Sequence, residues 1–386
     1  TASVQVDHCV VRNGQYFPTA YAPLDLRYQS TWNDQVGGPD YAYQWLLTAG
    51  LLDMQRGEQP TWLSNAIGAA HGRAAYPGKF PRVAAHGLAW GVTGIGFALE
   101  GFSNLLGGMN KHSHWSVIRE KSGGADVRAG REFLDRFAAL AVNGRGEHAV
   151  GILFSKSQFQ RQHVAMGFGE SHCQIFVALV RLGYTPRFVT EEEIAADRIG
   201  GLKTLVVVGQ TFPLAEDARA GLQRFVQAGG KLLADGSTSV DLPGLQRFEA
   251  ELSFSKPGKP HNWAAPNMTG GDNDSFMFAR WYAANAPKLA AALGETGRAC
   301  LMPQTGALSP VTVMQLDGGK DARYVVAVND SFIATQADWF QVRENLMPGA
   351  GVTGSLYDLT EEKALGALAP VDCDLSATTA RVFGIL

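Results

Sequence analysis

The sequence predicts an α/β protein built from part of a (β/α) barrel, a Rossmann-like parallel α/β domain and a small C-terminal antiparallel β-sandwich. Short apolar runs alternate with amphipathic segments through residues 147–235, which indicates parallel strands joined by right-handed crossovers. A looser strand and helix alternation precedes that region, and short strand-like runs separated by turns follow it. We therefore expect the three units to occupy residues 1–146, 147–305 and 306–386.

In the first unit, apolar runs end in polar or aromatic residues. Residues 60–65 predict a strand that opens into a loop, residues 83–90 a helix, and residues 93–100 a buried strand with Glu100 at its carboxyl end. Residues 131–142 have the apolar spacing of an amphipathic helix. This order is typical of (β/α) units, in which the carboxyl ends of the strands carry the chemistry.

The middle unit has the clearest periodicity in the chain. Four apolar runs are typical of buried parallel strands. They are residues 148–154, 187–189, 204–208 and 231–235. Thr190 precedes three glutamates, which predicts a capped helix start with acids in its first turn. Residues 147–242 are therefore expected to form a four- or five-stranded parallel sheet, followed by a helix within residues 276–293.

The last unit changes to short apolar runs separated by turn residues. Four runs predict strands: residues 311–314, 323–328, 354–357 and 381–383. Their spacing is typical of a small antiparallel β-sandwich.

Composition excludes several classes of protein. The chain has 36 acidic and 33 basic residues, a formal charge of -3 and no long basic run, which argues against nucleic-acid binding. No apolar stretch is long enough to span a bilayer. The four cysteines are far apart and form no CxxC pair, so they indicate neither a zinc knuckle nor a disulfide framework. They leave the redox compartment open, and a secreted or periplasmic location is the working expectation.

Three stretches in this order resemble the family 42 β-galactosidases. They are residues 90–97 with 130–133, residues 150–154 through 227–232, and residues 324–329 through 381–383. The resemblance implies a (β/α)8 barrel, a domain shaped like a class I glutamine amidotransferase and a β-sandwich. It also implies hydrolysis of a β-linked sugar by two carboxylates, without a cofactor.

The chain departs from that family in the barrel. No Asn-Glu dipeptide, which carries the family's general acid/base, precedes the end of the barrel part. Only about half of a barrel fits before residue 147, because a complete one needs roughly 250 residues. We therefore expect the other half on the same gene or on another chain. The family's nucleophile is a Glu at the end of strand seven, close to where Asn65 stands. Either the register differs or this member has lost or moved that group, since an amide cannot replace a carboxylate nucleophile.

The middle domain lacks the thiol of a glutamine amidotransferase. The turn after its third strand reads Gly209-Gln210-Thr211-Phe212, so no nucleophilic cysteine follows that strand. In the resembled family this domain serves assembly. The resemblance therefore implies a homo-oligomer, with a trimer as one form.

Two carboxylates are the catalytic candidates in the expected cleft. Glu100 ends an apolar strand. A charge there is costly unless it is solvated or has a functional role. It is either an active-site carboxylate or a strand-end acid paired with an arginine. Asp34 lies in a polar cluster beside Trp32. The Asn, Asp and Gly residues of this cluster could equally form a simple turn.

Further residues are candidates for substrate binding. Tryptophan rings in loops can stack on the C–H faces of sugars, although they also pack locally at a barrel rim. His112 and His114 have HxH spacing but no third ligand, so a hydrogen-bonding substrate loop is favoured over a metal site. The substrate-binding set is Trp32, Trp62, Asn65, Trp115, His112 and His114.

Two functions therefore compete. The chain is either a β-galactosidase-like glycoside hydrolase, or its C-terminal portion, or it is a non-catalytic relative that binds glycan or builds an assembly. Two facing carboxylates in one pocket favour the first, and one or none favours the second.

Overall fold

A computed structural model describes most of the α/β domain and the sandwich, and isolated elements of the first unit. The described residues are 3–6, 26–31, 61–65, 79–89, 94–97, 121–143, 148–158, 172, 175–176, 178–249, 274–306, 309–319, 321–329, 342–376 and 379–386.

The first unit contains a four-stranded parallel sheet. Its strands are β1 (Ser3–Val6), β2 (Leu26–Thr31), β3 (Thr61–Asn65) and β4 (Gly94–Phe97), in the spatial order β1-β2-β3-β4. Helix α4 (Lys79–Ala89) joins β3 to β4, and helix α6 (Lys121–Asn143) follows β4. Sequential parallel strands, with α4 between β3 and β4, are what (β/α) units produce. Closure into a barrel stays a prediction.

The α/β unit has a five-stranded parallel sheet, as the sequence predicted. The strands are β5 (Val150–Phe154), β6 (Arg187–Thr190), β7 (Thr204–Val207), β8 (Lys231–Ala234) and β9 (Leu245–Arg247). Their order is β6-β5-β7-β8-β9, and every pairing is parallel. Strand β6 therefore lies on one side of β5, and β7 to β9 lie on the other side. This is the strand order of a doubly wound fold.

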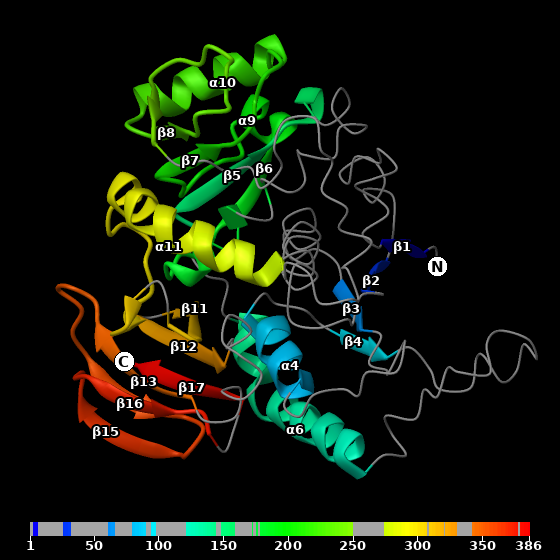
Figure 1. The fold of residues 1–386 in the computed structure, drawn as a ribbon, viewed down its shortest axis with the longest axis vertical. Coiled ribbons are helices and arrows are strands. Elements are labelled where there is room, and N and C mark those ends of the chain that lie inside the picture. The colour runs from blue at the N-terminus through cyan, green and yellow to red at the C-terminus, as the bar shows by residue number, and fades with distance from the viewer. Residues whose placement is uncertain are drawn as a thin grey trace, which may run out of the picture.

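Helices cover both faces of this sheet (Figure 1). Helices α9 (Glu191–Ala195) and α10 (Glu216–Gln227) pack on one face through Ile194, Leu222 and Phe225. The helical residues 178–181 and helix α11 (Asp274–Leu293) cover the other face. Burial on both faces explains why these strands read as continuous apolar runs.

The C-terminal unit is a sandwich of two antiparallel sheets. One sheet has the order β10-β13-β16 and the other β11-β12-β17-β14-β15. The strands are β10 (Leu301–Pro303), β11 (Val311–Gly319), β12 (Ala322–Asn329), β13 (Arg343–Pro348), β14 (Ser355–Asp358), β15 (Lys363–Ala367), β16 (Val371–Asp374) and β17 (Ala380–Ile385). Leu301, Leu346 and Cys373 of the first sheet share a core with Val313 and Phe383 of the second.

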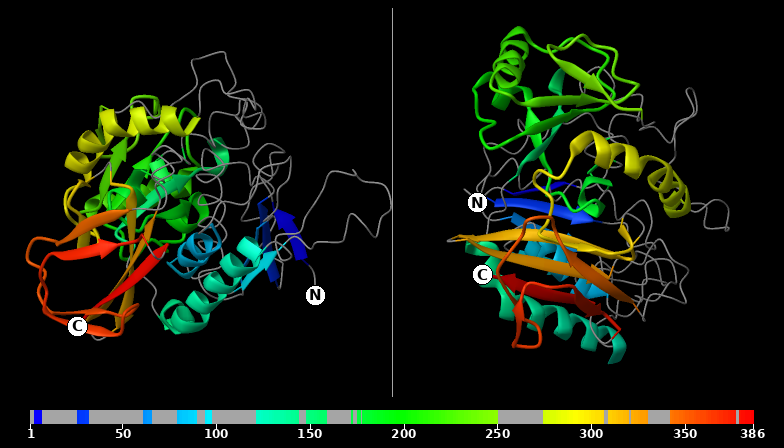
Figure 2. Two further views of the ribbon diagram at one scale, coloured as in Figure 1. Left: turned by 60° about the horizontal axis from the view of Figure 1, so that its bottom comes forward. Right: turned by 90° about the vertical axis from the view of Figure 1, so that its left-hand side faces the viewer.

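Helices α4 and α6 lie between the sandwich and the four-stranded parallel sheet (Figure 2). Leu88 and Phe137 on these helices share one hydrophobic core with Val326 and Val382 on the outer face of the larger antiparallel sheet. The same core continues to Phe176 of the α/β unit. One apolar interior therefore joins the described parts of all three units.

Candidate functional site

The carboxyl edge of the four-stranded sheet is where the sequence places the cleft. Asn65 is the last residue of β3, and its backbone pairs in register with Thr31 at the end of β2 and Phe97 at the end of β4. Neighbouring strands of a sheet are about 4.8 Å apart. Three consecutive strand ends therefore meet at one edge.

Trp62 sits elsewhere on the same strand. It is the second of the five residues of β3 and pairs in register with Tyr28 and with Gly94, the first residue of β4. Its backbone is therefore near the amino end of the strand, three residues before Asn65. The binding roles of Trp62 and Asn65 stay predictions.

The remaining candidates of the cleft lie outside the described residues. They are Trp32, Asp34, Glu100, His112, His114 and Trp115. In sequence, Trp32 and Asp34 follow the end of β2 by one and three residues, and Glu100 follows the end of β4 by three. Their roles are carried forward as proposals.

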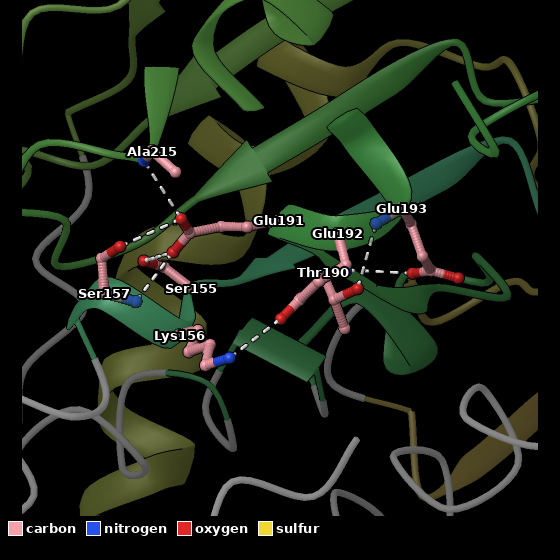
Figure 3. A network of polar contacts seen from close by, with 8 residues as sticks. All are labelled: Ser155, Lys156, Ser157, Thr190, Glu191, Glu192, Glu193 and Ala215. Atoms are coloured by element: carbon pink, nitrogen blue, oxygen red, sulfur yellow. Dashed lines mark hydrogen bonds and ion pairs between the residues drawn. The ribbon is translucent and has the colours of Figure 1, made fainter. Parts of the chain in front are cut away.

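The carboxyl edge of the α/β sheet is a second place where chemistry could occur, and the structure describes it in detail. Glu191, the first residue of α9, is buried and receives four hydrogen bonds (Figure 3). Its Oε1 accepts from the Ser155 hydroxyl at 2.6 Å and the Ser157 N–H at 2.8 Å. Its Oε2 accepts from the Ser157 hydroxyl at 3.0 Å and the Ala215 N–H at 3.2 Å. The carboxylate thus ties the loops after β5 and β7 to the end of β6.

A glutamine side chain joins the loop that follows β5 to the loop that follows β7. Gln158 is 0% exposed. Its Oε1 accepts from the backbone N–H groups of Thr211 at 2.8 Å and Phe212 at 3.0 Å, and its Nε2 donates to the Thr211 hydroxyl at 3.1 Å. Both ends of this carboxamide are satisfied inside the protein.

Asp235, which follows β8, is the third buried acceptor at this edge. Its Oδ1 accepts from the Gly209 N–H at 3.0 Å and the Thr238 hydroxyl at 2.7 Å. Its Oδ2 accepts from the Ser237 N–H at 3.2 Å and also from the Ser237 hydroxyl. The polar groups at this edge therefore bind one another.

No cysteine thiol accompanies these groups in the part of the chain that the structure describes. The turn after β7 presents Gln210, whose Nε2 donates to the Phe212 carbonyl at 2.6 Å. The described thiols belong to Cys300 and Cys373 in the sandwich core, where burial raises their pKa to about 11 and about 12. Both stay protonated at neutral pH, and a protonated thiol is a poor nucleophile.

Two further kinds of site, for a metal ion and for a membrane, concern the described ranges. No cluster of three or more His, Cys, Asp or Glu side chains there is arranged to hold a metal ion. Among the same residues, no helix is long and apolar enough to cross a membrane.

Sequence reasoning did not single out Ser155, Gln158, Glu191 and Asp235. A signal was present, because Asp235 ends a predicted strand and the other three stand within four residues after one, and parallel strands bring such positions to one edge. The partners are 34, 53 and 26 residues apart along the chain. Pairing them therefore requires the order of the strands.

The chain matches no protein-family model and no curated protein sequence. Its fold is similar to that of solved GH42 enzymes. One is a catalytic mutant of Gan42B, a GH42 β-galactosidase from G. stearothermophilus, with 13% sequence identity and a TM-score of 0.61. The match covers 96% of this chain and 60% of that one.

A second similar structure is the GH42 exo-carrageenase from Bacteroides ovatus. It has 11% identity and a TM-score of 0.50, and the match covers 88% of this chain and 44% of the other. The chain thus spans well under two thirds of the length of either enzyme. At these identities the likeness is one of fold.

Proposed function

We propose, from a fold shared with GH42 enzymes, that this chain is a β-galactosidase-like glycoside hydrolase, or its C-terminal portion, and hydrolyses β-linked sugar. The observation that carries the proposal is the fold match over 96% of the chain. The parallel strands β1 to β4 add support, because their carboxyl ends meet at one edge. Trp32, Asp34 and Glu100 follow strand ends at that edge within three residues in the sequence.

In this proposal the chemistry belongs to the first unit. Asp34 and Glu100 are its catalytic carboxylates, since both closely follow the strand ends that meet beside Asn65. A retaining mechanism would hold the two carboxyl groups about 5 Å apart across the glycosidic bond. Trp32, Trp62, Asn65, Trp115, His112 and His114 complete the carbohydrate site.

A further (β/α) segment belongs to the proposal. Each outer strand of the described parallel sheet, β1 and β4, has one described neighbour. A (β/α)8 barrel needs eight strands, so four more would come from the same gene or another chain. We further propose that the α/β unit serves assembly into a homo-oligomer.

The second candidate function is a non-catalytic protein that binds glycan or builds an assembly. The observation in its favour is Asn65, which ends β3 close to the place where the resemblance leads us to expect the family's nucleophilic Glu. An amide there could bind a hydroxyl group of a sugar but could not form a glycosyl-enzyme bond.

The test is turnover and binding in matched variants. We expect the protein, supplied with any encoded preceding segment, to hydrolyse a chromogenic β-galactoside. Glu100→Gln should lower kcat by orders of magnitude and leave galactose affinity nearly unchanged, because the amide keeps the shape and loses the charge. Glu132→Gln, on the exposed face of α6, is the control and should retain activity.

Two results would decide against hydrolysis. Wild-type protein that binds galactose without turnover would favour the non-catalytic function. Wild-type activity in Glu100→Gln would exclude Glu100 as a catalytic residue.

A further inference from the structure

The boundary between β5 and β7 is the place in the strand order where doubly wound sheets bind their ligands. The chain enters the sheet at β5 and continues to β6 on one side and to β7 on the other. The loops that leave the carboxyl ends of such strands part at this point and form a binding crevice. In this protein the Gln158 side chain lies between those loops.

The contacts of Gln158 are those that a bound small molecule would make. Two consecutive backbone N–H groups, of Thr211 and Phe212, point at its single carbonyl oxygen. Successive N–H groups that converge in this way form an acceptor site, or nest, of the kind that binds anions and carbonyl oxygens. The Thr211 hydroxyl accepts from the amide nitrogen, so the site recognises both ends of a carboxamide.

The turn that carries these two N–H donors is also held by residues that follow β8. Asp235 accepts from the Gly209 N–H at 3.0 Å, and the Thr238 hydroxyl accepts from the Gln210 N–H at 3.3 Å. Gly209 adopts a positive φ of 61°, which bends the chain sharply after β7. These contacts do not involve Gln158, so they orient the turn independently of its side chain.

Glu191 repeats the pattern beside it. Its carboxylate accepts hydrogen bonds from the N–H groups of Ser157 and Ala215. Four backbone N–H groups at this edge therefore point at two buried side-chain acceptors, one an amide and one a carboxylate.

We propose that Gln158 is a built-in ligand that occupies a preformed site for a small carboxamide or carboxylate. The wild-type α/β unit is closed to such molecules because its own side chain fills the site. Shortening that side chain opens the site. This inference does not depend on the glycosidase proposal, since it concerns a different sheet.

Chemical rescue tests the proposal. Gln158→Ala removes Cγ, Cδ, Oε1 and Nε2, which are the heavy atoms of acetamide. We expect the variant to have a lower Tm than wild type, and acetamide to raise that Tm in a saturable manner. The rise should be about 1–2 °C at twice the dissociation constant, from the linkage between ligand binding and stability. Wild-type protein should show no saturable shift. Acetate, which can accept the same two N–H groups, is the second probe.

Gln210→Ala is the matched control. It removes a neighbouring buried glutamine whose Nε2 donates to the Phe212 carbonyl. It therefore leaves a carbonyl without its donor, and acetate cannot supply one. Acetate should not raise the Tm of Gln210→Ala.

The proposal is overturned if neither acetamide nor acetate stabilises Gln158→Ala more than wild type. It is also overturned if acetate stabilises both variants equally. If Gln158→Ala does not fold, Gln158→Ser replaces it, with formamide and formate as the probes, because that variant removes Cδ, Oε1 and Nε2, which are the heavy atoms of formamide, and keeps a polar side chain. The same two outcomes then decide.

Discussion

Buried carboxylates in the described residues are mostly held by backbone N–H groups and hydroxyls. Glu191 and Asp235 follow this pattern in the α/β unit. Glu344 of β13 follows it in the sandwich, where its oxygens accept from Thr305 and from the Ser309 hydroxyl. Hydrogen bonds to an ionised acceptor are stronger than neutral ones and offset the cost of burial. Asp358 accepts from the Thr360 and Glu361 N–H groups and in addition forms a buried ion pair with Arg381.

The residue-scale prediction compares two neighbouring glutamates. Glu191→Ala should lower the free energy of unfolding by about 2–4 kcal/mol, because it leaves two N–H groups and two hydroxyls, among them the buried Ser155 hydroxyl, without their acceptor. Glu192→Ala is the control. Its carboxylate is exposed and lies 3.5 Å from the Lys156 ammonium, so the change should be within about 0.5 kcal/mol. Urea unfolding measures both, and equal losses would contradict this account of Glu191.

At the scale of elements, local signals and close packing together set the α9–α10 pair. Thr190 and Glu193 form a capping box at the start of α9, with the Glu193 N–H bound to Thr190 Oγ1 at 3.3 Å and the Thr190 N–H bound to Glu193 Oε2 at 3.0 Å. Helix α10 then packs on α9 at Gly221. A Cβ at that position would lie 2.3 Å from the Ile194 carbonyl oxygen.

This close approach gives the element-scale prediction. Alanine normally stabilises a helix relative to glycine by up to about 1 kcal/mol. Gly221→Ala should instead lower the free energy of unfolding by about 1–3 kcal/mol, because the added methyl overpacks the contact. Gly200→Ala, with no atom within 4 Å of the new Cβ, should change it by less than about 0.5 kcal/mol. A stabilised Gly221→Ala variant in urea unfolding would show that the two helices separate at little cost.

Over the whole molecule, polar contacts accompany the shared hydrophobic core at the interfaces. Arg136 of α6 donates to the Leu359 carbonyl at 2.6 Å and pairs with Glu362 at 3.0 Å in the sandwich. Arg181 of the α/β unit is buried, lies over the Tyr282 ring and donates to the Ser309 carbonyl. The described parts of the units are therefore joined by apolar and by charged contacts.

The prediction at this scale is cooperative unfolding. Leu88→Ala should lower the free energy of unfolding by about 2–5 kcal/mol, because it opens a cavity in the core shared by α4, the sandwich and the α/β unit. Amide exchange in β7 and in β12 should accelerate together. Leu365→Ala on β15, where the leucine is 37% exposed, should change the free energy by less than about 0.5 kcal/mol. Faster exchange in β12 alone would mean that the sandwich unfolds separately.

Local patterns in the sequence were sufficient for many elements. Apolar runs located β5 to β8, β11, β12, β14 and β17 to within a few residues, and the cap at Thr190 was read correctly. They did not locate β1, β2, β9, β10, β13, β15 or β16. In β13 a buried position is occupied by Glu344, and the five residues of β15 are all exposed, so neither strand has the alternating apolar pattern of a half-buried strand.

For the functional residues, the chain sequence determined which polar groups follow each strand, since that depends on local order alone. It predicted Asp34, Glu100 and the tryptophans for the first unit, and these roles stay predictions. The contacts that Gln158, Glu191 and Asp235 make with neighbouring loops were decided only by the tertiary structure. Their partners come from different loops, and the strand order β6-β5-β7-β8 brings those loops together. Hydrogen bonds reach about 3 Å, so they depend on positions in space that sequence separation does not specify.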